Sequence, residues 1–153
     1  MPDMSDRNCG CNDLLEQYKL YVEMADRVSD RRERTNRFYI SLLSALMALI
    51  PILQSREMLS PVLLALLAAL GMALCFIWYR NLESYRRLNS AKFAVIHEME
   101  KRLPCQCYSR EWEMLKRKGY RRLTEVEQRI PLLTGVIFLL LFLVSLYLII
   151  QRV

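Results

Sequence analysis

Three long apolar segments constrain this chain more than any other feature of its sequence. They are Phe38–Leu53, Pro61–Tyr79 and Pro131–Ile150, and none contains Asp, Glu, Lys, Arg or His. An α-helix needs about 20 mostly apolar residues to cross a bilayer core of about 30 Å. The second and third segments meet this length, and the first does so with Asn36 and Gln54 at interfacial depth. The sequence therefore predicts three transmembrane helices.

A soluble chain would have to bury these segments as core helices. Hydrophobic residues make up 54% of the 153 residues, so little polar sequence remains to cover three such helices. The first 37 residues are polar and lack the apolar core of a signal peptide. We therefore expect an all-α integral membrane protein that forms a single membrane domain over residues 1–153.

Basic residues are distributed unevenly between the segments that flank the spans. Met1–Arg37 has 7 Lys or Arg and Arg80–Ile130 has 13, whereas the loop Gln54–Ser60 has one and the tail has only Arg152. Basic residues near span ends favour the cytoplasmic side. We predict that the N-terminus and the segment between the second and third spans are cytoplasmic, and that the short loop and the C-terminus lie outside.

Helical spacing continues outside the first predicted span. In the first cytoplasmic arm, residues 1–37, apolar or small residues recur alternately four and three positions apart, which indicates one face of a helix. No glycine or proline interrupts the segment after Gly10, so we predict one helix from about Asn12 to Leu53. The face consists of Leu14, Tyr18, Tyr21, Ala25 and Val28.

A second arm, residues 80–104, follows the second span. Ser60 is predicted to cap this helix, with Pro61 at its first position and Pro104 at its end. The arms have about 26 and 25 residues, so the first two helices should form a long antiparallel hairpin that extends into the cytoplasm. Its apolar face, which would contact the first arm or another protomer, contains Leu82, Tyr85, Leu88, Val95, Met99 and Leu103, widened by Phe93 and Ile96.

The cytoplasmic linker, residues 105–130, is predicted to contain a short amphipathic helix from about Ser109 to Gly119. Thr124–Glu127 has the form of a capping box before the third span, which Pro131 is expected to bend. The net charge of +6 could indicate nucleic-acid binding, but the main basic cluster lies close to the third span, where it would contact anionic lipid headgroups. We expect the lipid bilayer and no nucleic acid as the partner of Lys116, Arg117, Lys118, Arg121 and Arg122.

Small residues at helical spacing could allow close packing within the bilayer. The same residues are common in any membrane helix, so chance is the alternative. The candidates are Ser41, Ala45 and Ala48 in the first span and Ala65, Ala69, Gly71 and Ala73 in the second.

The sequence contains no recognisable catalytic motif. The single histidine, His97, lies in the second arm without a nucleophile pattern around it, and four glycines leave little for a phosphate-binding loop. We predict that the chain is not an enzyme.

Two Cys-x-Cys pairs lie where the arms are predicted to end. Antiparallel arms of similar length would bring both pairs to the same level, where four thiolates could bind zinc tetrahedrally. Disulfides and free cytosolic thiols are the alternatives. The residues are Cys9, Cys11, Cys105 and Cys107.

Three stretches of the chain resemble the RipR family of small bacterial integral membrane proteins: LLEQYKLYVEMADRVSDRRERTNRFYISLLSAL, SYRRLNSAKFAVIHEMEKRLP and LTEVEQRIPLL. The resemblance extends over about Leu14 to Leu133. The layout of the helices is more loosely similar to the SLATT class of membrane effectors. The family resemblance implies a multi-pass bacterial inner-membrane protein that is encoded near defence genes, and it implies no catalytic residue; the C-terminus would then be periplasmic. The looser similarity to the SLATT class implies a role in bacterial conflict and phage defence.

Two functions from different classes remain open. In the first, the chain is an oligomeric effector that permeabilises or depolarises the inner membrane when its arms receive a cytoplasmic signal or protein partner. In the second, it is a membrane anchor that recruits a cytoplasmic defence protein. A small transporter is a weaker third reading, because the spans lack charged binding groups.

Overall fold

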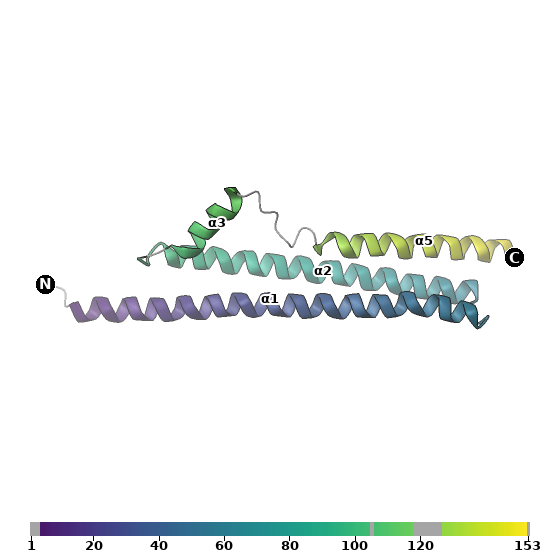
Figure 1. Cartoon of the computed structure of the whole chain (residues 1–153), viewed down its shortest axis with the longest axis horizontal. Coiled ribbons are helices and arrows are strands. Elements are labelled where there is room, and N and C mark those ends of the chain that lie inside the picture. Colours follow the sequence, from purple (N-terminus) through teal and green to yellow (C-terminus); the bar gives the residue numbers. More distant parts are fainter. Residues whose placement is uncertain (1–3, 105, 118–126, 153) are drawn as a thin grey trace. The chain divides into compact units, whose positions relative to one another are not determined.

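The structure, a computed structural model, describes residues 4–104, 106–117 and 127–152, and their side chains except those of residues 4–12, 116 and 152. These residues form helices and loops, as Figure 1 shows, which confirms the predicted all-α class. The helices are α1 (Met4–Ser55), α2 (Pro61–Glu100), α3 (Cys107–Arg117) and α5 (Arg129–Arg152).

Three of these helices are long and apolar enough to cross a membrane, as predicted. The candidate spans lie within Asp13–Ser55, Pro61–Glu100 and Arg129–Gln151, with mean hydropathies of 1.8, 2.4 and 2.8 in their most apolar windows. The spans of α1 and α2 each form one helix with a polar segment, because neither helix breaks where the apolar sequence ends.

The helix ends differ from the sequence expectation by a few residues. α1 begins at Met4 and not at Asn12, and α3 spans Cys107–Arg117. α2 ends at Glu100, before Leu103, because a turn with three-residue hydrogen bonds leads into Pro104, which disfavours helical backbone in the residue before it. The predicted capping box at Thr124 lies outside the described residues.

The loop between α1 and α2 has defined caps on both sides. The Met58 N–H donates to the Leu53 carbonyl at 3.0 Å and the Glu57 N–H to the Gln54 carbonyl at 3.1 Å, which is the Schellman pattern. This motif places Glu57 at a φ of 56°. On the other side, the Ser60 hydroxyl accepts the Leu63 N–H at 3.1 Å, as its predicted capping role requires.

The chain divides into two compact units. The arm unit comprises Met1–Arg32 and Tyr85–Arg122, and the membrane unit comprises Glu33–Ser84 and Leu123–Val153. α1 and α2 contribute to both units, α3 belongs to the arm unit and α5 to the membrane unit.

Buried positions in the membrane unit recur every seven residues, the spacing of helices that pack along a left-handed supercoil. On α5 they are Pro131, Phe138 and Ser145. α5 lies beside α2 (Figure 1), and a Cβ added to Gly71 of α2 would lie 2.6 Å from Cγ of Phe138. The core is formed by Tyr39, Leu43, Cys75, Trp78, Leu82 and Phe138.

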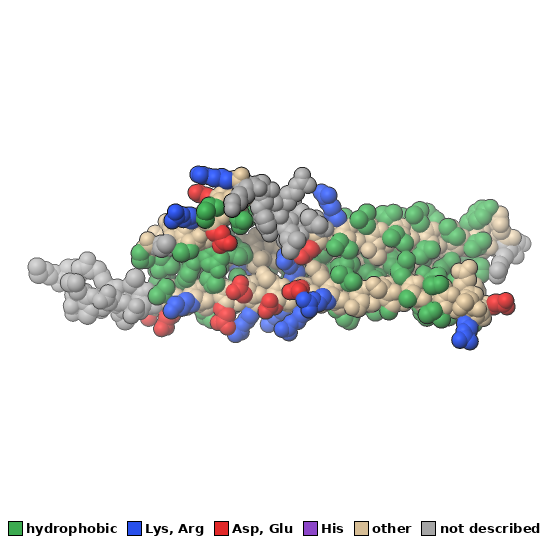
Figure 2. Space-filling model, viewed as in Figure 1, with side chains coloured by type: hydrophobic (Ala, Val, Ile, Leu, Met, Phe, Trp, Pro, Cys, Tyr) green, Lys and Arg blue, Asp and Glu red, His purple; other side chains and the backbone are tan. Residues whose placement is uncertain are grey.

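The outer surface of the membrane unit is apolar. Figure 2 shows hydrophobic side chains over most of its visible face. Large side chains are exposed on all three helices, including Phe38 of α1 (60%), Phe76 of α2 (65%) and Leu133 of α5 (67%). An apolar surface of this extent is unsuited to water and fits contact with lipid or with another span.

Candidate functional site

A buried carboxylate connects three helices in the arm unit. Glu100, the last residue of α2, is 0% exposed. Its Oε1 accepts hydrogen bonds from the Tyr18 hydroxyl at 3.1 Å and from the Tyr108 N–H at 2.8 Å. Its Oε2 accepts the N–H and the hydroxyl of Ser109 at 3.1 and 3.0 Å. The carboxylate therefore has one donor from α1 and three from the first turn of α3.

The start of α3 explains why a carboxylate is suited to this position. The first N–H groups of a helix have no acceptor within the helix, and the helix dipole places partial positive charge there. Tyr108 and Ser109 are the second and third residues of α3, so Glu100 supplies the acceptors that a local cap would otherwise provide. These charge-assisted hydrogen bonds attach the start of α3 to the end of α2.

The protonation states of this cluster follow from the same contacts. Burial by itself raises the pKa of Glu100, but the hydrogen bonds from Tyr108, Ser109 and Tyr18 outweigh it and leave the pKa below its ordinary value. Burial, followed by the hydrogen bond to Glu100, raises the pKa of Tyr18. Burial also raises the pKa of Tyr108. At neutral pH the carboxylate is therefore charged and both phenols are protonated.

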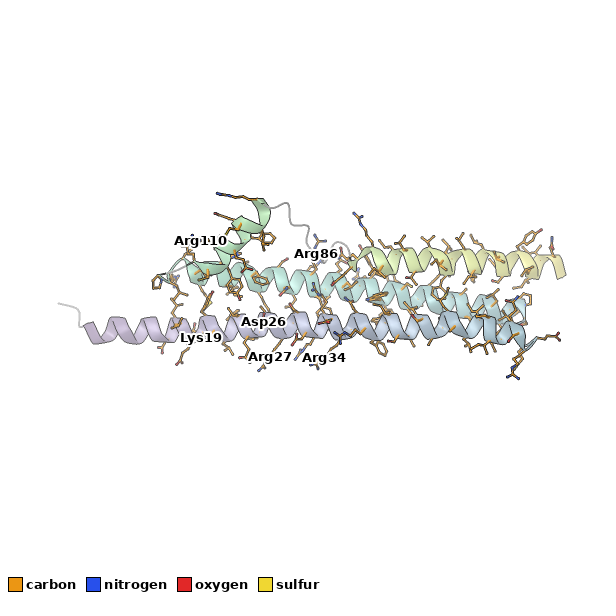
Figure 3. The ribbon with its side chains drawn as sticks, in the orientation of Figure 1. Lys19, Asp26, Arg27, Arg34, Arg86 and Arg110 are labelled. Atoms are coloured by element: carbon orange, nitrogen blue, oxygen red, sulfur yellow. The ribbon has the colours of Figure 1, made fainter. Side chains whose placement is uncertain are left out.

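Aromatic contacts surround the carboxylate cluster. The Tyr108 ring meets the rings of Tyr18 and Phe93 edge to face, with centroids 6.4 and 5.9 Å apart. Nearby, the Lys92 ammonium lies 5.8 Å from the centre of the Tyr21 ring. Arg27 extends from α1 on the side away from α2 (Figure 3) and pairs with Glu23 at 2.7 Å. The inner contacts are thus aromatic, while charged residues occupy the exposed side of α1.

A second polar cluster lies in the membrane unit, where the predicted spans of α1 and α2 begin and end. The Trp78 indole N–H donates to Oδ1 of Asn36 at 2.9 Å, and the Asn81 amide donates to the Tyr39 hydroxyl at 3.1 Å. The Tyr39 and Trp78 rings stack, with centroids 5.8 Å apart and planes 10° apart. Aromatic residues with satisfied polar groups are typical of the membrane interface.

A shallow groove of about 340 Å³ lies next to this second cluster. Its lining is apolar apart from two hydroxyl groups, and the Thr134 hydroxyl already donates to the Ile130 carbonyl at 2.9 Å. The lining consists of Ile40, Leu43, Ser44 and Met47 of α1, Trp78 of α2, and Ile130 and Thr134 of α5.

The small residues predicted to pack the spans lie in different environments. Gly71 is buried, and the atoms nearest to a Cβ added there belong to Phe138 of α5. Gly135 of α5 faces the same helix, because a Cβ there would lie 3.6 Å from Cβ of Cys75. Of the other predicted residues, Ala65 and Ala69 are half-buried and Ser41, Ala45, Ala48 and Ala73 are exposed.

The residues predicted to form contacts between the arms range from buried to exposed in the structure. On α1, Ala25 and Val28 are buried, and Leu14, Tyr18 and Tyr21 are half-buried. On α2, Tyr85 and Met99 are half-buried, whereas Leu88 and Val95 are exposed. The buried face of this arm is centred on Ile96 instead, one position after Val95.

Sequence reasoning missed the role of Glu100. The signal was available, because Glu100 follows Ile96 at helical spacing and so extends the apolar face with a charged residue. A carboxylate in that position requires hydrogen-bond donors. The donors come from Tyr108 and Ser109, and their approach depends on the turn between α2 and α3.

Side chains are not described for most of the residues predicted to bind zinc or lipid headgroups. Cys107 is exposed; Cys105 is not described, nor are the side chains of Cys9 and Cys11. Zinc binding by these four cysteines stays a prediction. Of the basic cluster, Arg117 is exposed, the Lys116 side chain is not described, and Lys118, Arg121 and Arg122 lie outside the described residues.

These features define a small helical membrane protein with three spans, two of which continue into polar helical arms. Over residues 15–147 the chain matches the model of the octameric membrane protein family (8xMP), and it belongs to this family. Membership implies a homo-oligomer in contact with the lipid bilayer. The match supports neither the RipR family nor the SLATT class specifically. No curated protein and no solved structure matches the chain.

Proposed function

We propose that the chain is a non-enzymatic membrane effector of bacterial phage defence. It assembles as an octamer, receives a cytoplasmic signal through its arm unit, and responds by permeabilising or depolarising the inner membrane. Family membership supports the oligomeric part of this proposal. The resemblance to defence-associated membrane proteins motivates the remainder.

The continuity of α1 and α2 carries the proposal. Each helix passes from residues of the arm unit to residues of the membrane unit without a break in its backbone hydrogen bonds. A helix resists local bending because each peptide group is bonded four residues away. A partner that twists or shifts an arm therefore acts on the span of the same helix.

A conducting pathway must be formed between protomers. The three spans contain no charged side chain, and the two hydroxyls in the groove, of Ser44 and Thr134, face an otherwise apolar lining. Such a surface does not provide a hydrated route through one copy. An oligomer can instead enclose a hydrophobic constriction that opens when its spans move.

The test is a potential-sensitive dye in bacteria that express the full chain. We expect depolarisation after phage infection in cells with the natural chain, and none in uninfected cells or in cells without it. Variants Glu100→Ala and Glu98→Ala form a matched pair, since the first disturbs the buried cluster and the second an exposed neighbour. An unchanged potential in infected cells that contain correctly inserted protein would reject the effector proposal.

A membrane anchor is the second candidate. The arm unit exposes several large apolar side chains, among them Leu20, Leu88 and Met114, which could bind another protein. Under this proposal, purification from cells would retain a cytoplasmic protein in fixed proportion, and the membrane potential would not change.

A further inference from the structure

Among the described residues of the arm unit, one apolar face of α2 is exposed. Leu88 is 46% exposed and Val95 is 37% exposed, and Ala91 between them is also exposed. The spacing of three and four residues places them on one face. Phe93, which contacts Tyr108 of α3, points to a different side of α2, so α3 does not cover this face.

A second uncovered face lies on α1 of the same unit. Leu20 is 55% exposed and Met24 is 40% exposed, and they lie one helical turn apart. They lie on a face beside the one that buries Ala25 and Val28, since Met24 precedes Val28 by four residues. Isolated exposed apolar residues are common, but two faces on antiparallel helices of a homo-oligomer require a further explanation.

We propose that the α2 face of one copy packs against the α1 face of the next copy. This inference rests on the oligomer in the proposed function. Copies inserted with the same orientation can be related only by rotation about the membrane normal, because any two-fold axis in the membrane plane would invert a copy. A closed ring of this kind joins two different faces at each contact.

The levels of the two faces along the hairpin agree with such a rotation, which moves a residue sideways but not along its axis. Tyr18 of α1 bonds to Glu100 of α2, and Tyr21 lies under Lys92. On α1, Leu20 lies between Tyr18 and Tyr21. On α2, Val95 lies between Lys92 and Glu100. Leu20 and Val95 are therefore at the same level.

A second pair of residues, one helical turn closer to the spans, also lies at the same level on the two faces. Met24 follows Leu20 by four residues on α1, and Ala91 precedes Val95 by four residues on α2. Because the helices are antiparallel, both steps go in the same direction along the hairpin. The long Met24 side chain would then face the small Ala91, which is the pairing of large and small residues that close helix packing requires.

A second copy is the better occupant than a different protein because the two faces match each other in level and size. The α2 face covers about two helical turns and the α1 face about one, which is small for an independent binding site, whereas in a ring the contact is repeated between all copies. The same seam, repeated at every contact, adds to the packing between spans.

Disulfide trapping in membranes tests the inference with the full chain. The variant combines Leu20→Cys and Val95→Cys in a chain whose five natural cysteines are replaced by serine or alanine. We expect oxidation to give a ladder of dimers, trimers and larger products, because every copy carries both halves of the contact. Leu20→Cys or Val95→Cys alone should give no ladder. The control pair Asp26→Cys and Ser90→Cys should give none either, because both residues are exposed and lie outside the two faces.

The other outcomes are informative. Dimers formed by one single-cysteine variant and ending at two copies would overturn the inference in favour of a symmetric contact between like faces. An intact oligomer without a ladder would overturn the inference and leave the oligomeric function standing, whereas a monomer in native membranes would overturn both. A ladder of equal yield in the control pair would overturn it as non-specific collision.

A charge-pair cycle provides a second test with the natural cysteines in place. Val95→Glu and Leu20→Lys should each weaken assembly by at least about tenfold, because each buries one unpaired charge in the seam. The double variant should recover most of the loss, measured as the oligomer fraction at matched concentration in detergent. Losses in the double variant equal to the sum of the two single losses would contradict the proposed contact.

Discussion

At the scale of single residues, Glu100 is the most informative side chain in the arm unit. Its charge is buried, yet all its described partners donate hydrogen bonds, so the charge is stabilised by the first turn of α3 and by Tyr18. Removal of such an acceptor leaves buried N–H groups without a partner, which costs more than the hydrogen bonds themselves contribute. The start of α3 therefore depends on one residue of another helix.

Glu100→Ala should destabilise the arm unit by about 3 kcal/mol, because the Tyr108 and Ser109 N–H groups lose their acceptor. Hydrogen exchange of these two amides, followed by mass spectrometry, should accelerate, and the thermal midpoint in detergent should fall. Glu98→Ala is the control, since Glu98 is exposed on the same turn of α2. Equal exchange in the two variants would contradict the role assigned to the carboxylate.

The lowered pKa of Glu100 predicts a pH dependence with a defined sign. A carboxyl whose pKa is lower in the folded chain stabilises that chain fully above its ordinary value of 4.5, and this contribution is lost as the pH falls through the lower, folded value. The difference in thermal midpoint between the natural chain and Glu100→Ala should be constant from neutral pH down to about 5 and shrink in more acidic buffer. A difference that grows in acid would show that the charged form is not the stabilising one.

Gly71 and Gly135 form a matched pair for helix packing in the membrane unit. An alanine at 71 would place its Cβ against the fully buried Phe138 ring, whereas an alanine at 135 would be in ordinary contact with Cys75. We expect Gly71→Ala to destabilise the natural chain by about 1–3 kcal/mol through overpacking, and Gly135→Ala to have little effect. Thermal unfolding in detergent measures both, and a second change, Phe138→Leu, should recover part of the loss in Gly71→Ala.

At the scale of helices, the loop between α1 and α2 contains a residue in a conformation that glycine adopts more easily. Glu57 has a φ of 56° in the Schellman motif, which costs a non-glycine residue about 1 kcal/mol. Glu57→Gly should therefore stabilise the hairpin by about 0.5–1 kcal/mol. Glu57→Ala separates this effect from loss of the carboxylate, since alanine keeps the strain. A gain as large in the alanine variant would attribute the effect to charge.

The helices show how much the sequence could predict. Lengths and hydropathies indicated three spans, and the Ser60–Pro61 pair indicated the start of α2, because these signals are local. The apolar face predicted for the second arm is only partly buried within the chain. Leu88 and Val95 form an apolar face beside the one that is buried, and the buried face contains the polar Asn89 and Lys92 at half-buried positions.

Contacts between distant segments could not be read from spacing alone. Whether Gly71 packs against the first or the third span depends on which side of α2 receives α5, and Phe138 decides it in the structure. The same holds for the hydrogen bond between Trp78 and Asn36, which are 42 residues apart. The sequence indicated that these residues would lie at helix contacts or at the membrane interface. Which residue each one contacts depends on how the three helices pack together.

At the scale of the whole molecule, mixing natural and inactive chains in one homo-oligomer tests how many copies must act together. If the proposed effector acts only as a complete octamer, one inactive copy should disable the whole assembly. With natural and inactive chains in equal amounts, random mixing would leave only about one octamer in 250 without an inactive copy. Copies that act independently would instead retain about half of the activity, so the two cases differ by roughly a hundredfold.

Glu100→Ala is the proposed inactive copy because it removes the acceptor at the start of α3 and leaves Leu20 and Val95 unchanged. The two chains would carry different affinity tags, and co-purification would establish that they mix before activity is measured. Depolarisation plotted against the fraction of natural chain should fall far more steeply than a straight line. A linear decline among chains shown to mix would mean that each copy breaches the membrane alone, and the coupling through a ring would have to be abandoned.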